Sequence, residues 1–391
     1  MLDNNFKAIS KQLLERVCSE GWPESQTLDF KALAYGKSDD DKLELAKDVC
    51  AFANADGGDL VIGISEKSGS ANTILGLTGE TADQLQRRIQ QTLDAKIEPR
   101  INGIRVTTVD VDGGFVLAMR VPASYDGPHC VRDTDSWRRF VIRNGTNTSD
   151  MTFDQVRSAF DRTATLTERV RQLIDSRLLI INAGKTWRPM MKGPACVVHV
   201  VPLSSMVGRT SVDVSKLHDD FINFLGDDWG GGSRTLNLDG LIVHPGGDND
   251  DGVYAYNQVF RNGALEFVRF GGLSDGRKIV PSTDATKFYR DSLKMAFKQA
   301  PALGQSGPAI VKCALLNAEG FELGVGGGYH SRRTTLLDRR DIALPDAWVE
   351  SLESVIDVDA IARPMMDVLW QSFDVQRCLE YREDGVWAPR G

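Results

Sequence analysis

The stretch between Lys42 and Ile64 constrains the fold more than any other part of the chain. It joins a helical pattern over 42–54 to the pair Gly57-Gly58 and then to the apolar run Asp59–Ile64. Ser38 to Asp41 supply an N-cap and negative charge where that helix begins. Glycine readily adopts the left-handed conformation that ends a helix, so this stretch predicts a helix, a tight turn and a buried strand. A helix end of negative partial charge argues against phosphate binding at the glycines.

Hydrophobic periodicity places further elements on both sides of this stretch. Additional helices are predicted at 4–18, 80–96 and 151–179, with strands at 27–31, 102–111, 115–121 and 137–143. Residues 182–194 mix turn formers with scattered apolar residues and are predicted to be a linker. The pattern then restarts, with strands at 195–202, 238–244, 253–261, 264–270, 308–316 and 320–325 and helices at 214–225, 282–299 and 353–376. The prediction is an α+β chain with one domain over 1–180 and a second α+β domain over 195–391.

Charge and cysteine content exclude several classes of protein. The net charge of −8 argues against a chain that coats nucleic acid nonspecifically. Acidic residues are concentrated in 1–80 and basic residues in 81–180, which leaves room for a local basic surface beside an acidic one. The six cysteines lie far apart without zinc or redox spacing, as in a cytoplasmic protein. We expect neither a membrane span nor a secretion signal.

The strongest chemical signal lies between Glu24 and Lys31, with Glu66 after the next strand. Side chains two apart on a strand point the same way, so Asp29 and Lys31 share a face. If the two strands are neighbours, Glu66 and Glu24 approach Asp29, and a cation such as Mg²⁺ or Mn²⁺ is the natural partner for three carboxylates. Such an ion could assist phosphodiester cleavage, with Lys31 stabilising charge on the phosphate. The alternative is that these residues lie in turns and in exposed ion pairs, which contribute little to stability.

The segment Trp137–Arg143 is the best candidate for RNA contact. Strict alternation along it would place Trp137, Arg139 and Arg143 on one face, where an aromatic ring could stack a base and guanidinium groups could hold phosphates. Arg87 and Arg88 on the helix at 80–96 could extend this surface. The alternative for 137–143 is an edge strand whose arginines pair with nearby carboxylates. The alternative for Arg87 and Arg88 is a solvated face of their helix.

Several of these motifs together resemble the Schlafen AlbA-like domain over about residues 15–165. The resemblance rests mainly on Glu24 to Lys31 and on Asp48-Val-Cys-Ala-Phe-Ala-Asn-Ala-Asp-Gly-Gly-Asp-Leu-Val-Ile-Gly-Ile-Ser-Glu66. Supporting matches are Ile74-Leu-Gly76, Ile97-Glu-Pro-Arg-Ile101, Val121-Pro-Ala-Ser124, Pro128-His129, Trp137-Arg-Arg-Phe-Val-Ile-Arg-Asn-Gly145 and Thr148. Where the family's site residues are usually glutamate and then aspartate at the second and third positions, this chain has Asp29 and Glu66.

The resemblance implies a metal-dependent endoribonuclease that acts on transfer RNA or other structured RNA. Glu24, Asp29 and Glu66 then match the positions that hold Mg²⁺ or Mn²⁺, and Lys31 assists the phosphate. A cytoplasmic effector of phage defence or stress is the implied role. Relatives with paired lobes suggest a homodimer here, or a degenerate second lobe within the C-terminal domain, which could otherwise serve sensing or oligomerisation. The alternative is a noncatalytic regulator that binds nucleic acid or ATP.

Overall fold

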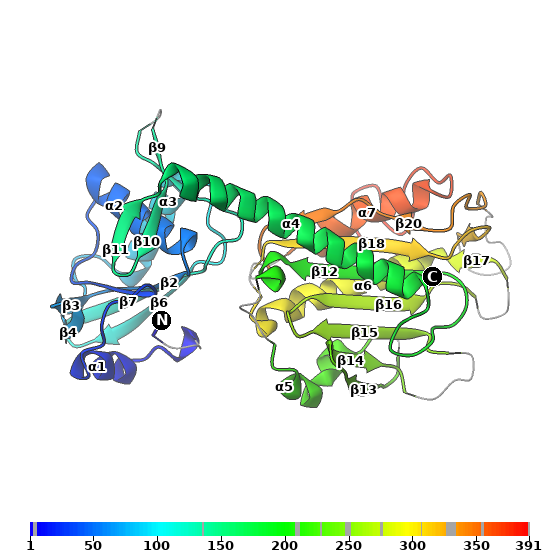
Figure 1. Ribbon diagram of the computed structural model, residues 1–391, viewed down its shortest axis with the longest axis horizontal. Helices are drawn as coiled ribbons and strands as arrows, with labels where there is room; N and C mark the ends of the chain where they lie inside the picture. The colour runs from blue at the N-terminus through cyan, green and yellow to red at the C-terminus, as the bar shows by residue number, and fades with distance from the viewer. Residues whose placement is uncertain are drawn as a thin grey trace. The chain divides into compact units, whose positions relative to one another are not determined.

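The chain consists of two units, Met1–Thr165 and Leu166–Gly391 (Figure 1). The computed structural model describes residues 1–2, 6–134, 137–207, 212–226, 229–246, 252–273, 277–305, 307–325, 334–352 and 356–389. The division falls within helix α4 (Phe153–Asn182) instead of in the predicted linker. Its second half contributes buried apolar side chains to the second unit, namely Leu166, Val170, Ile174, Leu178 and Ile181. No helix in the described ranges combines the length and apolar character needed to cross a membrane.

A four-stranded sheet forms the centre of the first unit. Its strand order is β1 (Leu28–Lys31), β2 (Gly58–Ile62), β7 (Gly114–Val121) and β6 (Arg105–Val111). The first two strands are parallel, with Asp29 opposite Leu60, and the other pairs are antiparallel. A parallel pair needs a crossover connection, which helix α2 (Asp39–Asn54) provides. The sheet therefore brings residues 28–31 beside residues 59–62, as the sequence analysis required.

Both faces of this sheet are buried. Leu60 and Ile62 belong to a core with α2 and α3 (Ala82–Lys96), whereas Val61 packs in a second core with α1 (Lys11–Ser19). The alternation along β2 thus divides one strand between two cores. The smaller elements of this unit are η1 (Phe6–Ala8), β3 (Ile64–Lys67), β4 (Ser70–Ile74), β5 (Ile97–Glu98), β8 (Cys130–Arg132), β9 (Arg138–Arg139), β10 (Val141–Asn144) and β11 (Asn147–Asp150).

Close packing after α2 leaves no room for a side chain at Gly57 or Gly58. Gly57 has φ +70°, and a Cβ atom there would lie 2.5 Å from the backbone nitrogen of Ala123. A Cβ on Gly58 would lie 2.4 Å from the Phe52 ring. Ser38 begins α2 with a capping box that includes Asp41, as its sequence predicts. The turn therefore serves the close packing of helix and strand.

The second unit is built on an antiparallel sheet. Its strand order is β13 (Ser233–Leu236), β14 (Gly240–His244), β15 (Ala255–Phe260), β16 (Leu265–Phe270), β12 (Ala195–Pro202), β18 (Ala309–Leu316) and β20 (Ile342–Ala343), and β21 (Ala347–Val349) also pairs with β18. A parallel pair, β17 (Ile279–Pro281) and β19 (Glu322–Gly324), lies apart from it. This strand order does not repeat the mixed sheet of the first unit. The expectation of a degenerate second lobe is therefore wrong for the described strands.

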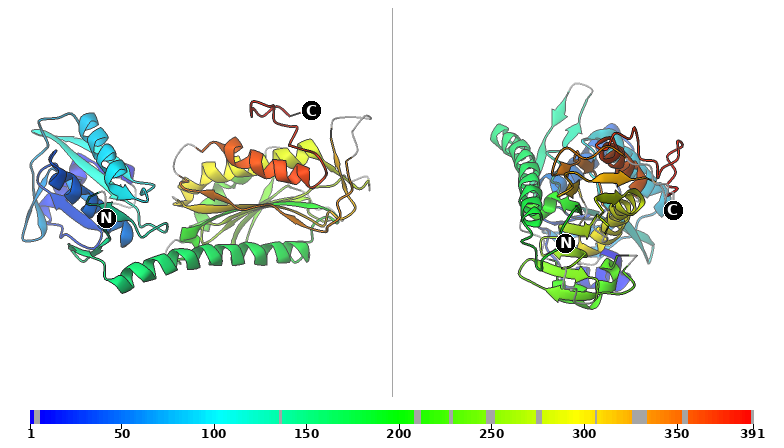
Figure 2. Two further views of the ribbon diagram at one scale, coloured as in Figure 1. Left: turned by 90° about the horizontal axis from the view of Figure 1, so that it is seen from above. Right: turned by 90° about the vertical axis from the view of Figure 1, so that its right-hand side faces the viewer.

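Helices cover both faces of that sheet within the second unit. Helices α6 (Ser282–Gln299) and α7 (Val358–Gln371) lie on one face, and the second half of α4 lies on the other (Figure 2). Shorter helical segments are α5 (Val214–Asp219), η2 (Leu203–Met206), η3 (Phe221–Phe224) and η4 (Ala300–Leu303). The large core beneath α6 and α7 includes Tyr289, Phe267 and Trp370.

Glu266 on β16 joins α4 to the sheet. The Nε and Nη2 atoms of Arg177 each lie 2.8 Å from one of its carboxylate oxygens. His199 Nε2 and the hydroxyl of Tyr256 are within 2.9 Å and 2.8 Å of the same carboxylate. Burial alone would raise the pKa of Glu266, but the hydrogen bonds from Arg177 and His199 lower it to about 2. This buried charge is fully compensated.

Candidate functional site

Three segments of the first unit bring Glu24, Asp29 and Glu66 together. Asp29 lies on β1 and is 4% exposed, while Phe30 beside it faces the core against α1. The backbone N–H of Glu24 donates to the carbonyl of Gly69, in the turn between β3 and β4, and Glu66 lies on β3. One oxygen of Glu24 accepts a hydrogen bond of 3.1 Å from the N–H of Phe30. The sheet and its hairpin therefore position all three carboxylates; we call them the carboxylate cluster.

The charges of the cluster act on one another. Burial raises the pKa of the Glu24 carboxyl, and the nearby carboxylates of Asp29 and Glu66 raise it further against the opposing hydrogen bond from Phe30. Glu66 itself is exposed. The cluster thus holds like charges at short range in a half-buried position.

Lys31 and Asp48 extend the cluster. Lys31 Nζ lies 3.1 Å from Oδ2 of Asp29 and 3.3 Å from Oδ2 of Asp48. Burial acts to lower the pKa of Lys31, but the two carboxylates outweigh it and raise the pKa above its usual value. Asp48, which the sequence analysis did not single out, is buried on α2 and accepts a hydrogen bond of 2.6 Å from the hydroxyl of Tyr35. The available signal was a carboxylate within the mostly apolar stretch 45–53 of a helix.

Arg143 is a buried partner of Asp29 and does not belong to an RNA-binding surface. Its side chain is 1% exposed, and its Nη2 lies 3.0 Å from Oδ1 of Asp29. It also donates to the carbonyls of Ser25 and Leu28, and its guanidinium lies over the Phe52 ring at 4.5 Å. The expectation that Arg143 shares an exposed face with Trp137 and Arg139 is wrong.

The reason is an interruption of the expected strand at Phe140. Arg138 and Arg139 form β9, which pairs with β8, whereas β10 begins at Val141 and pairs with β11. Alternation therefore does not run through 137–143. Trp137 remains 71% exposed, and Arg139 forms an ion pair of 2.9 Å with Asp150.

The two arginines predicted on α3 differ in their surroundings. Arg88 Nη1 donates to the carbonyls of Tyr35 and Gly36, and its guanidinium pairs with Glu80. It therefore fixes the connection between β1 and α2. Arg87 is exposed and has no polar partner within the described part of the chain.

Oxygen ligands for a hard cation are present, but a complete ligand set is not assembled. Across the described ranges, no three His, Cys, Asp or Glu side chains are arranged to hold a metal ion. Both oxygens of Asp29 already face a cation, Arg143 on one side and Lys31 on the other. The contact of Oδ2 with Lys31 is an ion pair without good hydrogen-bond geometry, so this oxygen keeps a vacant acceptor position.

Comparison with known proteins gives a family for the first unit. Residues 24–152 match the family model described as Schlafen, AlbA_2. No curated protein matches the chain. The DIP2311 protein from Corynebacterium diphtheriae is similar at 23% identity with a TM-score of 0.25, over 35% of this chain and 25% of its own length. The N-terminal domain of a RecG-related protein from Nitrosomonas europaea is similar at 22% identity with a TM-score of 0.25, over 34% of this chain and 89% of that domain.

The chain thus spans a quarter of the length of the first of these proteins. The match to the family model includes the carboxylate cluster, the turn at Gly57 and the strand β10. Residues 24–152 of this α+β chain belong to the Schlafen AlbA_2 family.

Proposed function

We propose that the first unit binds RNA and cleaves it at the carboxylate cluster in a reaction that depends on Mg²⁺ or Mn²⁺. The observation that carries this proposal is the convergence of Glu24, Asp29 and Glu66 beside Lys31; burial and the charges of the other two carboxylates raise the pKa of Glu24. Perturbed carboxyl groups in close proximity are typical of catalytic and metal sites. Membership of residues 24–152 in the Schlafen AlbA_2 family supports a role with nucleic acid.

The charge balance of the site supports a divalent cation. Four carboxylates, those of Glu24, Asp29, Asp48 and Glu66, surround only two cations, Lys31 and Arg143. The excess of two negative charges equals the charge of one Mg²⁺ ion. Glu24, Asp29 and Glu66 would hold it, because Asp48 accepts from Tyr35 and Thr148, whereas Oδ2 of Asp29 has, within the described residues, only its ion pair with Lys31. When bound, such an ion polarises a phosphate oxygen and lowers the pKa of a bound water.

The protein's own groups would orient the site. Arg143 would fix the carboxylate of Asp29 from below the surface, and its guanidinium also packs over the Phe52 ring. Lys31 keeps its positive charge and is about one third exposed, so it can contact a phosphate while the carboxylates hold its base. Trp137 and Arg87 offer exposed groups for RNA outside the cluster, and Arg139 is partly exposed in its ion pair with Asp150.

Transfer RNA as substrate, a cytoplasmic role in phage defence or stress, and assembly as a homodimer complete the proposal. These parts rest on the family resemblance alone.

A noncatalytic role in binding nucleic acid is the second candidate. It is favoured by the ion pairs of Asp29, which already satisfy much of its charge, and by the incomplete ligand set within the described residues. In this case the cluster is an electrostatic feature of the fold, and exposed side chains such as Trp137 do the binding.

Cleavage of RNA by the full chain, with Mg²⁺, with Mn²⁺ and with EDTA, separates the two candidates. We expect metal-dependent cleavage that Glu24→Gln and Glu66→Gln each reduce by at least about a hundredfold, because each removes a charge from the ion's ligands. Lys31→Ala should reduce cleavage while metal binding, measured by calorimetry, persists. Glu15→Gln, which alters an exposed carboxylate on α1, is the matched control.

RNA binding without cleavage under any of these conditions would support the noncatalytic role. Cleavage that survives both glutamine variants would exclude the carboxylate cluster as the site.

A further inference from the structure

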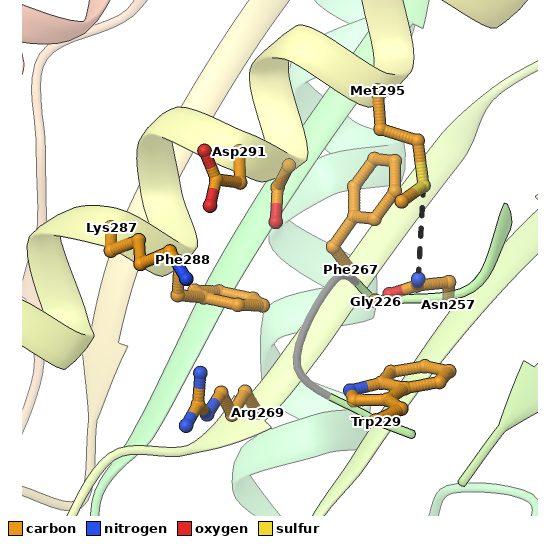
Figure 3. A pocket seen from close by; sticks show the side chains of 10 residues that line it. Gly226, Trp229, Asn257, Phe267, Arg269, Lys287, Phe288, Asp291 and Met295 are labelled. Carbon is orange, nitrogen blue, oxygen red and sulfur yellow. Dashed lines mark hydrogen bonds between the residues drawn. The ribbon is translucent and has the colours of Figure 1, made fainter. Parts of the chain in front are cut away.

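We propose that the second unit holds a binding pocket for a single-ring heteroaromatic anion between α6 and the strands β15 and β16. Figure 3 shows side chains of α6 on one side of the hollow and Asn257, Phe267, Arg269 and Trp229 on the other. None of these residues belongs to the carboxylate cluster. The pocket is therefore a separate site, and its test does not depend on nuclease activity.

The size and the walls of the pocket suit one ring. It encloses ≈ 40 Å³. One ordered water takes about 10–15 Å³ of such space, so the pocket holds about three waters or one six-membered ring. Phe288 and Trp229 provide aromatic walls, and Phe267 and Met295 complete an apolar lining. Aromatic walls favour a flat, polarisable ligand over an aliphatic one.

Two largely buried polar side chains in the lining are available to a ligand. Asn257 and Ser292 are 4% and 6% exposed. The amide nitrogen of Asn257 donates to the carbonyl of Phe224 and contacts the sulfur of Met295. Neither the amide oxygen of Asn257 nor the hydroxyl of Ser292 has a hydrogen-bond partner in the described ranges. Neither atom is among the fully buried atoms that lack a partner in the described residues, so both face the hollow, where the N–H or carbonyl groups of a heteroaromatic ring can reach them.

The charged residues of the lining favour an anion. Arg269 and Lys287 flank Phe288 in Figure 3, and they outnumber the single carboxylate of Asp291. Lys287 is exposed and has no polar partner in the described structure. A second hollow shares Arg269 and Phe288 with the first and continues to Pro281, but it also contains the carboxylate of Asp284 in the first turn of α6. A ring in the first hollow can extend a negative group toward Lys287 and Arg269, on the side away from Asp284.

A phosphate on a pyrimidine nucleoside and a carboxylate on the ring itself are the two sources of such an anion. Calorimetric titration of the full chain with 5′-UMP and with orotate distinguishes them. Uridine, which has no charge, should bind about tenfold more weakly than 5′-UMP, and 5′-AMP should also bind more weakly because its double ring exceeds the enclosed space. Failure of both 5′-UMP and orotate to bind at millimolar concentration would overturn the proposal, as would equal affinity for uridine and 5′-UMP.

Variants of two exposed lysines on α6 provide the matched test. Lys287→Ala should weaken binding of the anion by roughly fivefold to tenfold, whereas Lys294→Ala, on the same helix but outside the pocket lining, should leave it unchanged. Phe288→Ala should abolish binding, and circular dichroism establishes that the variant is folded. Equal loss in both lysine variants, or in neither, contradicts the assigned site.

Discussion

Two acidic centres, one in each unit, use the same chemical group in opposite ways. Glu266 is completely buried, and Arg177, His199 and Tyr256 all hydrogen-bond its carboxylate. Its pKa is lowered to about 2. Glu24 is half buried beside two further carboxylates, and its pKa is raised.

The difference separates a carboxylate whose charge is compensated within the fold from one that is crowded by like charges. A carboxylate that has all its partners within the fold has little left to offer a ligand, whereas one that is crowded by like charges gains from a cation or a proton. Asp29 stands between the two extremes, since Arg143 and Lys31 compensate it while Glu24 opposes it. This contrast should be visible in the stability of each unit.

Removal of the carboxylate in the second unit should have the largest effect. Glu266→Ala leaves the cation of Arg177 buried without a partner, and we expect it to lower the free energy of unfolding by about 4 kcal/mol. Denaturant titration measures the change, and Glu319→Ala, at an exposed position, serves as the control. A loss below about 1 kcal/mol would show that water or other groups replace the carboxylate.

The pH dependence of stability should have opposite signs in the two units. The depressed pKa of Glu266 stabilises the second unit above its ordinary pKa of 4.5, and this contribution is lost as the pH falls toward 2. The change is about 3 kcal/mol for a shift of this size. The raised pKa of Glu24 stabilises the first unit below its ordinary pKa, and that contribution is lost as the pH rises through the raised value.

Hydrogen exchange at several pH values resolves the units, because peptides from β1 and β16 report on them separately. Glu266→Gln should remove the acid-induced loss in the second unit, and Glu24→Gln should flatten the opposite slope in the first. Parallel slopes in both units would contradict the contrast.

Replacement of Arg143 should have an intermediate effect on stability. Arg143→Ala removes one of the two cations that compensate Asp29, and we expect a loss of about 2 kcal/mol because Lys31 remains. Arg139→Ala removes only an exposed ion pair and should cost under about 0.5 kcal/mol. Thermal unfolding of the two variants measures this difference; equal losses would mean that burial does not distinguish the two arginines.

Trp137→Ala should have the smallest effect on stability, within about 0.5 kcal/mol, because the side chain is largely exposed. Binding of single-stranded RNA should nevertheless weaken by about 1 kcal/mol or more if the ring stacks on a base. Fluorescence anisotropy with a labelled RNA measures that loss, and Trp348→Ala, which alters a partly exposed tryptophan of the second unit, is the comparison. Unchanged affinity would remove Trp137 from the proposed RNA surface.

The elements that were predicted best have strong periodicity and clear end signals. Strand β12 and helix α6 have the predicted bounds, 195–202 and 282–299. The terminal helix expected at 353–376 is shorter, Val358–Gln371, and residues 353–355 of the expectation lie outside the described residues. The unit boundary was missed because one continuous helix serves both units, and no loop marks the transition.

The candidate site was only partly accessible from sequence. Alternation correctly placed Asp29 and Lys31 on one face of β1. The approach of the carboxylates required β1 and β2 to be neighbours, and the two strands do pair, in parallel. The pairing of Arg143 with Asp29 joins residues 114 positions apart, which no local pattern reports. Because strand alternation was assumed to continue through Phe140, the buried Arg143 was placed on the surface. Tertiary contacts, not local propensity, decide such positions.

The continuous helix α4 has a practical consequence for dissection of the chain. Its 30 residues extend for about 45 Å. A fragment that ends after Asn182 would keep the whole helix but lose the sheet that covers Leu166, Val170, Ile174, Leu178 and Ile181. That fragment would expose these apolar side chains to solvent and would therefore tend to aggregate. Truncation at Thr165 ends the helix before these apolar side chains, and is the better place to separate the two units.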